Sequence, residues 1–142
     1  MSKNQMPDPR RKFLKILAAS PLVACSSGSG APASFGVVAA GNVSSAPVGT
    51  LSVVPNAPAI LARDSDGLYA MTITCTHEGC DVTPTGVTLY CPCHGSRFDD
   101  NGAVLQGPAS SALVHFAVTL DANGAITVDG TKQVAASART AV

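Results

Sequence analysis

Two similar stretches lie ten residues apart in the middle of this 142-residue chain: CTHEGC (residues 75–80) and CPCHGS (residues 91–96). Each holds one histidine close to a cysteine, together with a second cysteine. The intervening residues, DVTPTGVTLY, are enough for a turn and a short strand. The two stretches are therefore expected to form loops at the ends of neighbouring strands, where they can face each other across a gap.

Four kinds of site are compatible with cysteines and histidines paired in this way. Two disulfides would leave both histidines without a role. A zinc site with two sulfur and two nitrogen ligands is chemically sound, but it needs no extra cysteine in each loop. A catalytic Cys–His pair needs only one such loop and a third group that orients it. A two-iron cluster would take one thiolate and one imidazole from each loop and leave two cysteines as a brace. The residue types favour the cluster and leave the other three open.

The loops resemble the signature of the Rieske iron–sulfur family, C-x-H-x-G-C followed by C-P-C-H-G-S. Both halves are complete, and the resemblance extends over about residues 41–130, where it depends on strand pattern and turns. It implies one [2Fe-2S] cluster per chain. In that arrangement Cys75 and Cys91 would be the thiolate ligands of one iron, and His77 and His94 would ligate the other.

The resemblance also implies roles for residues that support the cluster loops. Cys80 and Cys93 would form a disulfide that joins the two loops. Gly79 and Gly95 would permit tight turns that bring backbone N–H groups toward the cluster sulfurs. These four residues are expected to shape the site without ligating iron.

Three further residues are expected around the cluster on the same basis. The stretch GPAS (residues 107–110), with Pro108, resembles the loop that covers the cluster, although the family often has another proline where Ser110 stands. Ser96 occupies the place of a hydroxyl that donates to a bridging sulfide. Phe98 stands where quinol-oxidising members usually have a tyrosine that donates to a ligand sulfur. Loss of that donor is expected to lower the reduction potential.

The mixed ligand set implies a particular range of reduction potential. Two thiolates balance the charge of two Fe³⁺ and two sulfides, and neutral imidazoles in place of two thiolates make reduction easier. Such centres fall at roughly −150 to +300 mV, against about −400 mV for plant-type ferredoxins with cysteine ligands alone. The free ring nitrogens of His77 and His94 would couple electron gain to proton gain, which suits oxidation of a quinol or another hydrogen donor.

The remainder of the domain predicts an all-β fold. Aromatic residues make up 4% of the chain, tryptophan is absent, and glycine and proline are frequent, which favours a small, loop-rich domain. Apolar runs are short and bounded by turn residues such as DSDG (residues 64–67), and none keeps a helical period. With the resemblance, this predicts a small antiparallel β-sandwich or barrel of the Rieske type with a two-loop cluster-binding subdomain. The predicted strands are residues 50–54, 59–63, 68–74, 112–121 and 125–130.

The N-terminal region has the pattern of an export signal. RRKFLK (residues 10–15) resembles the twin-arginine signal, and the apolar stretch after it is shorter than the ~20 residues that span a bilayer. LVAC (residues 22–25) resembles a lipobox, with Cys25 as the lipidated residue. The expected organisation is a signal peptide at residues 1–24, a flexible tether at 25–40, the Rieske domain at 41–130 and a loose C-terminal tail at 131–142.

Charge and compartment limit the partners. From residue 25 onward four basic side chains face eight acidic ones, which argues against a nucleic-acid partner. A disulfide needs an oxidising compartment, whereas the cluster is assembled in the cytoplasm, and export of the folded protein reconciles the two.

We therefore expect a one-electron carrier on the periplasmic face, anchored to the membrane through Cys25, rather than a stand-alone enzyme. It would exchange electrons with a redox protein or a membrane oxidoreductase, such as a cytochrome b or c, or with quinol. The alternative is a subunit of a catalytic complex, either a quinol–cytochrome c reductase or a molybdenum oxidase.

Overall fold

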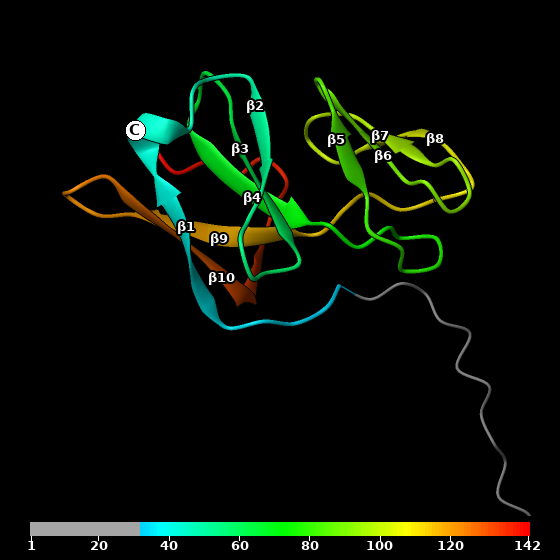
Figure 1. The fold of residues 1–142 in the computed structure, drawn as a ribbon, viewed down its shortest axis with the longest axis horizontal. Helices are drawn as coiled ribbons and strands as arrows, with labels where there is room; N and C mark the ends of the chain where they lie inside the picture. Colours follow the sequence, from blue (N-terminus) through cyan, green and yellow to red (C-terminus); the bar gives the residue numbers. More distant parts are fainter. Residues whose placement is uncertain (1–31) are drawn as a thin grey trace, which may run out of the picture.

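The computed structural model describes residues 32–142, so the predicted signal peptide and the lipobox with Cys25 lie outside the described residues. Over this range the chain forms ten β-strands, one short 3-10 helix and no α-helix. The strands build two antiparallel sheets (Figure 1). The prediction of an all-β, antiparallel domain is confirmed. Within residues 32–142, no helix has the length and hydropathy to cross a membrane.

The larger sheet has six strands in the order β1-β10-β9-β4-β3-β2. Every neighbouring pair in it is antiparallel. The 3-10 helix η1 (Val43–Ser45) directly follows the first strand. The strands are β1 (Val37–Asn42), β2 (Thr50–Val53), β3 (Ala59–Arg63), β4 (Leu68–Thr72), β9 (His115–Leu120) and β10 (Ala125–Val134).

The smaller sheet is an insertion between β4 and β9, which are neighbours in the larger sheet. Its four strands, in the order β5-β6-β7-β8, lie beside the larger sheet (Figure 1). They are β5 (Thr83–Thr85), β6 (Thr88–Tyr90), β7 (Arg97–Phe98) and β8 (Val104–Gln106). The two cysteine–histidine loops precede β5 and β7, so this sheet is the predicted cluster-binding subdomain.

The centre of the larger sheet is buried on both faces. In β3, Ile60 packs into the core on the side of the smaller sheet, and Leu61 packs into a second core on the opposite face. In β4, Met71 likewise packs into the core on the side of the smaller sheet, and Ala70 packs into the second core. Burial of both faces explains why these strands read as continuous apolar runs rather than as an alternating pattern.

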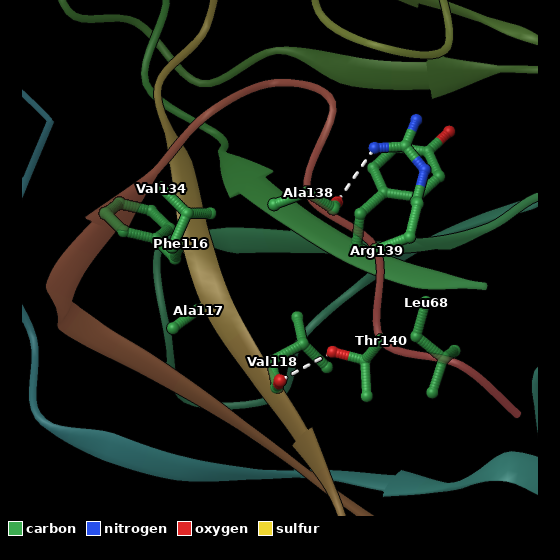
Figure 2. A pocket seen from close by; sticks show the side chains of 9 residues that line it. Leu68, Phe116, Ala117, Val118, Val134, Ala138, Arg139 and Thr140 are labelled. Atoms are coloured by element: carbon green, nitrogen blue, oxygen red, sulfur yellow. Dashed lines mark hydrogen bonds between the residues drawn. The ribbon is translucent and has the colours of Figure 1, made fainter. Parts of the chain in front are cut away.

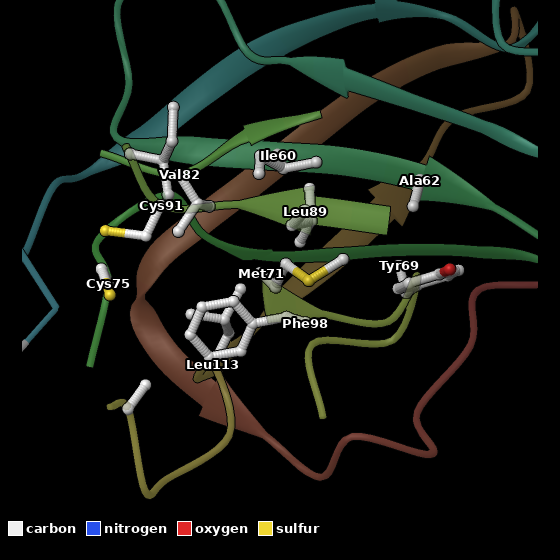
Figure 3. Packing of buried hydrophobic residues seen from close by; sticks show 12 residues of the cluster. Ile60, Ala62, Tyr69, Met71, Cys75, Val82, Leu89, Cys91, Phe98 and Leu113 are labelled. Carbon is white, nitrogen blue, oxygen red and sulfur yellow. The ribbon is translucent and has the colours of Figure 1, made fainter. Parts of the chain in front are cut away.

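The first of these cores leads directly to the cysteine–histidine loops. Figure 3 shows Phe98 and Leu113 packed beside Met71, with the Cys75 and Cys91 side chains at one end of the cluster. Both cysteines are buried, as is Phe98. The floor of the loops is therefore an apolar core shared by the two sheets.

The five predicted strands are present as β2, β3, β4, β9 and β10; β3 has the predicted bounds, and the other four have shifted ends. The predicted strand 68–74 ends at Thr72, and the predicted strand 112–121 begins at His115. The strands of the smaller sheet have two or three residues each. Segments this short contain too few side chains to show a period of two, which is why the sequence predicted only one short strand between the two loops and gave no bounds for it.

The structure corrects the prediction of a loose tail at residues 131–142. β10 continues to Val134 after a bulge, and its end pairs with His115 and Phe116 of β9. Further along, Thr140 and Leu68 exchange two backbone hydrogen bonds of 2.8 Å. The Thr140 hydroxyl also donates to the Val118 carbonyl at 2.6 Å (Figure 2). Backbone pairing needs no apolar side chain, so small polar residues gave no sign of it.

Position 67 requires a glycine, because the backbone of the C-terminal segment passes close to it. Its φ is +142°, and a Cβ at this position would collide with the Thr140 carbonyl. The turn prediction for residues 64–67 is thereby confirmed, with the Asp64 carboxylate accepting from the Asp66 and Gly67 backbone N–H groups.

The boundary between tether and domain is also corrected. Residues 37–40, assigned to the tether, belong to β1, which pairs with β10. Ahead of this strand, the Phe35 ring meets Phe116 edge to face with centroids 5.1 Å apart. The ring lies so close to Gly130 that a Cβ there would overlap it. The ordered domain therefore begins before residue 41.

Candidate metal centre

The two cysteine–histidine loops have the same backbone geometry. In the first, Gly79 N–H donates to the Cys75 carbonyl at 3.0 Å, and Cys75 N–H donates to the Cys80 carbonyl at 2.7 Å. In the second, Gly95 donates to Cys91 at 3.0 Å and Cys91 donates to Ser96 at 2.8 Å. Each loop is thus a tight turn of six residues that begins at a buried cysteine.

A glycine in the left-handed region makes each turn possible. Gly79 has φ +81° and Gly95 has φ +82°, values that side chains with a Cβ seldom adopt. Nothing lies within 4 Å of a Cβ built on Gly95, so the backbone angle and not the available space explains the glycine there. The predicted turn-forming role of both residues agrees with the structure.

A disulfide joins the two loops. Cys80 and Cys93 are bonded, with their Cα atoms 6.4 Å apart and a sequence separation of 13. The pairing implied by the family resemblance is confirmed. The interpretation with two disulfides between the loops is excluded, because Cys75 and Cys91 are free thiols within residues 32–142.

The two free thiols lie together at the buried end of the site. Cys75 has 0% and Cys91 has 2% of its surface exposed, and their side chains are in hydrogen-bond contact. Burial raises the pKa of the Cys75 thiol, while the His77 backbone N–H and the Ser96 hydroxyl act against this by donating to its sulfur. A buried thiolate here needs a positive partner, such as a metal ion, in addition to these donors.

The two histidines meet at the outer end of the site. The His77 and His94 rings lie edge to face with centroids 4.9 Å apart. The His77 Nδ1 atom is buried and has no hydrogen-bond partner within the described part of the chain. The His94 side chain is 46% exposed, and its Nε2 lies 3.5 Å from the Glu78 carboxylate. One ring nitrogen of His77 thus faces inward without a partner, while an edge of His94 faces solvent.

The covering loop at residues 107–111 is tied to both cysteine–histidine loops. The Ala109 backbone N–H donates to the buried Ser96 hydroxyl at 2.9 Å. The Thr76 hydroxyl donates to the Ser111 carbonyl at 2.6 Å, and the Gln106 side chain donates to the Gly95 carbonyl at 3.2 Å. Ser96 therefore connects the covering loop to Cys75, because its own hydroxyl donates to that sulfur.

Pro108 and Phe98 occupy different surroundings. Pro108 follows a cis peptide bond in the covering loop and is exposed, so it shapes the outer surface of that loop. Phe98 is fully buried in the core beneath the site. Its ring offers no donor to the cysteine sulfurs, as expected from its side chain.

The structure brings together all the residues that the sequence assigned to the two loops. Reasoning from sequence placed Ala109 in the covering loop but missed its hydrogen bond to Ser96, and it missed Thr76, which joins the first loop to the covering loop. It also missed Glu78, which lies beside His94. A threonine hydroxyl and an alanine backbone N–H carry no distinguishing sequence signal. Glu78 lies within the signature itself, but at a position that the pattern leaves free.

The donor set suits a cluster with two irons better than a single ion. Two buried thiols and the unpartnered His77 Nδ1 are available, with His94 adjacent, while the two remaining loop cysteines are used in the disulfide. Sulfur and imidazole nitrogen are the ligands of mixed iron–sulfur centres. Together with the two-sheet fold, these features define a small all-β iron–sulfur electron-transfer domain.

Comparison with known proteins identifies the family. The family model described as "Rieske [2Fe-2S] domain" matches residues 34–119, more than half of the chain. The chain belongs to the Rieske [2Fe-2S] family. It is an iron–sulfur electron carrier whose cofactor is a [2Fe-2S] cluster. The match begins before residue 41, in agreement with the corrected start of the ordered domain.

Individual relatives and structures agree with this assignment. The iron–sulfur subunit of the cytochrome b6-f complex of Prochlorococcus marinus is 42% identical over 96 residues, 60% of this chain and 53% of that protein. The same subunit of a Cyanothece species is 47% identical over 60 residues, covering 39% and 33%. The chain thus matches about half of the first relative's length and a third of the second's.

Among solved structures, the plasma-membrane Rieske protein PetC3 of Synechocystis PCC 6803 is 32% identical with a TM-score of 0.53. The match covers 65% of this chain and 98% of that one. A chain from the complex of oxygenase and ferredoxin in carbazole 1,9a-dioxygenase is 27% identical with a TM-score of 0.52, covering 70% and 96%.

Proposed function

We propose that the chain carries one electron at a time on a cluster held by Cys75 and Cys91 at one iron and by His77 and His94 at the other. The observation that carries this proposal is the meeting of two matched turns, locked by a disulfide, at two buried thiols and a histidine pair. When bound, a [2Fe-2S] cluster accepts and releases a single electron.

The protein residues divide the site into a closed side and an open side. The thiols lie against the apolar core and under the covering loop, which keeps water away from the sulfurs. The Ser96 hydroxyl and the His77 backbone N–H donate to the Cys75 sulfur and stabilise negative charge on it. The partly exposed His94 edge is the route by which a partner can approach and by which a proton can reach a ring nitrogen.

This ligand set and its surroundings support an intermediate reduction potential. Neutral imidazoles place the centre in the range of roughly −150 to +300 mV. Phe98 supplies no hydroxyl, so one hydrogen bond that would favour the reduced form is missing. We place the potential below the upper end of this range.

Redox titration of the purified full chain, followed by EPR, tests the proposal. We expect about two irons and two sulfides per chain and a Rieske-type signal on reduction, because each site holds one cluster. Cys75→Ser and His94→Ala should abolish the signal, whereas Cys25→Ser, which changes no proposed ligand, should retain it. A protein that contains zinc without iron would contradict the proposal.

The partner is proposed to be a redox protein or a membrane oxidoreductase on the periplasmic side. A second candidate is a subunit of a quinol-oxidising complex, which the relatives named as cytochrome b6-f subunits favour. A subunit of a molybdenum oxidase is the remaining candidate. Reduction by a quinol in the presence of the matching cytochrome b complex, and not without it, would support the second candidate.

Export and anchoring are proposed from the N-terminal sequence. Arg10 and Arg11 would direct the folded protein through the twin-arginine route, and Cys25 would become the lipidated N-terminus on the periplasmic face. Mass spectrometry of the mature protein tests this directly. A diacylated cysteine as the first residue is the expected result, and an unmodified terminus elsewhere would remove the anchor.

A further inference from the structure

Arg139 contacts two regions of the chain that are distant from it in sequence, residues 64–69 and residue 101. Its Nε lies 2.6 Å from the Asp64 carboxylate in the turn after β3. Its guanidinium stacks over the Tyr69 ring of β4 at 3.8 Å. Its Nη2 donates to the Asn101 side-chain oxygen at 2.9 Å. The side chain is only 15% exposed, so these contacts are shielded from water.

Asn101 lies in the turn that precedes β8 and the covering loop in the sequence. The Asp99 carboxylate closes this turn by accepting from the Asn101 and Ala103 backbone N–H groups at 3.0 and 2.8 Å. The Tyr69 hydroxyl donates to the Asp100 carbonyl at 2.9 Å. The turn is therefore held from within and is also attached to the larger sheet through Tyr69 and Arg139.

Residues 103–112 follow this turn, and their C-terminal end is also attached next to Asn101. The Leu113 N–H donates to the Gly102 carbonyl at 2.9 Å. The His115 ring lies 3.3 Å from the Asn101 side-chain oxygen through Nε2 and 3.2 Å from the Leu113 carbonyl through Nδ1. Asn101 is thus the point at which both ends of residues 103–112 meet.

Residues 103–112 form β8 and the covering loop. This segment reaches the metal centre through Ala109, whose N–H donates to Ser96, and through Ser111, whose carbonyl accepts from Thr76. A continuous series of contacts therefore leads from Arg139 to the hydroxyl that donates to Cys75.

We infer that Arg139 is a positioning residue for the metal centre: it fixes the base of the covering loop through Asn101. The guanidinium supplies what a lysine cannot, because its planar fork bonds Asp64 and Asn101 at once while stacking on Tyr69. The inference rests on the proposed function, since the positioned loop matters for electron transfer only if the centre carries the cluster.

The test compares Arg139→Gln, Asn101→Ala and Arg139→Lys with two matched controls in the holoprotein. Thr140→Val removes the neighbouring hydrogen bond to Val118 but leaves the guanidinium untouched. Lys132→Ala removes an exposed charge on the same C-terminal stretch. Backbone hydrogen exchange and the rate of cluster loss to an iron chelator are measured for each variant well below its unfolding temperature.

Arg139→Gln and Asn101→Ala should each speed exchange in residues 103–112, and cluster loss, by about tenfold, as expected for loss of a hydrogen bond to a charged group. In residues 103–112 the double variant should exchange no faster than either single variant, because both break the same hydrogen bond between Arg139 and Asn101. In Arg139→Lys, slow hydrogen exchange should be retained in residues 135–142 but lost in the covering loop. The reduction potential should fall in the first two variants, as the Ser96 donor loosens, and stay unchanged in the controls.

Faster exchange confined to residues 135–142, or spread evenly over the chain, would overturn the inference. Asn101→Ala with unchanged loop protection would do the same, and it remains informative even if Arg139→Gln fails to fold. Hydrogen exchange measures the opening of the covering loop directly and does not depend on a signal from the metal. An unsubstituted protein that lacks a Rieske-type signal would therefore contradict the proposed function separately.

Discussion

At the scale of single residues, the donors around the cysteine sulfurs distinguish this centre. The Ser96 hydroxyl is present and held by Ala109, while Phe98 places an apolar ring where a tyrosine hydroxyl would add a further donor. Each hydrogen bond to a ligand sulfur stabilises the more negative, reduced form. The residue at position 98 therefore adjusts the potential without altering the ligands.

Phe98→Tyr should raise the reduction potential. One added hydrogen bond, at a net 0.5–1.5 kcal/mol, corresponds to about 20–60 mV for a one-electron couple. Redox titration followed by EPR measures the change. Phe98→Leu is the control, because it alters the core without adding a donor. An equal rise in both variants would show that repacking, and not the hydroxyl, moves the potential.

His115 should make the fold sensitive to mild acid. Burial lowers the pKa of its imidazole below the usual 6.5, so the unfolded chain binds a proton that the folded chain resists. The contribution of neutral His115 to the free energy of unfolding is therefore fully present above about pH 6.5, and it declines as the pH falls toward the folded-state pKa. Unfolding midpoints measured between pH 7.5 and 5.5 test this, with His115→Gln expected to flatten the slope. An unchanged slope in that variant would assign the effect elsewhere.

At the scale of elements, the centre consists of two copies of one turn. The motif types predicted this arrangement because cysteine, histidine and glycine at these spacings are specific. The supports from Thr76, Asn101 and Arg139 could not be predicted, since hydroxyl, amide and guanidinium groups are common and pair across long sequence separations. The C-terminal pairing at Thr140 was hidden for a related reason, because it uses backbone groups that every residue has.

Removal of the disulfide should loosen the two turns. Cys80→Ser with Cys93→Ser is expected to lower the free energy of unfolding by about 3 kcal/mol, the value for a closed loop of similar size. Cluster loss should also accelerate, because the turns can separate. Thermal unfolding and bleaching of the visible spectrum measure both effects, with Cys25→Ser as the cysteine control. Full stability in the double variant would mean that the shared core alone holds the turns together.

At the scale of the whole molecule, the C-terminal segment links the two sheets, and its Arg139 pairs with Asp64, a carboxylate that titrates at low pH. Burial tends to raise the pKa of Asp64, but hydrogen bonds from Arg139 and from the Asp66 and Gly67 N–H groups outweigh it and lower the pKa below the usual 3.8. This stabilisation is complete above the unfolded-state pKa and disappears as the pH falls through the folded-state value.

Acid below about pH 4 should therefore release residues 135–142. Hydrogen exchange or limited proteolysis of that segment at pH 3 and pH 6 measures the release. In Asp64→Asn the segment should already be less protected at pH 6 and should change little on acidification. Equal protection of the unsubstituted chain at both pH values would contradict this prediction.

The insertion of the smaller sheet between β4 and β9 has a consequence for the order of folding. Its strands pair with near neighbours in sequence, whereas β1 pairs with β10 across most of the domain. Contacts between sequence-distant segments form slowly, and local ones form quickly. We expect the hairpins of the insertion to appear within the first folding events and the closure of the larger sheet to set the overall rate. The two cysteine–histidine turns would then form before the larger sheet that encloses them is complete.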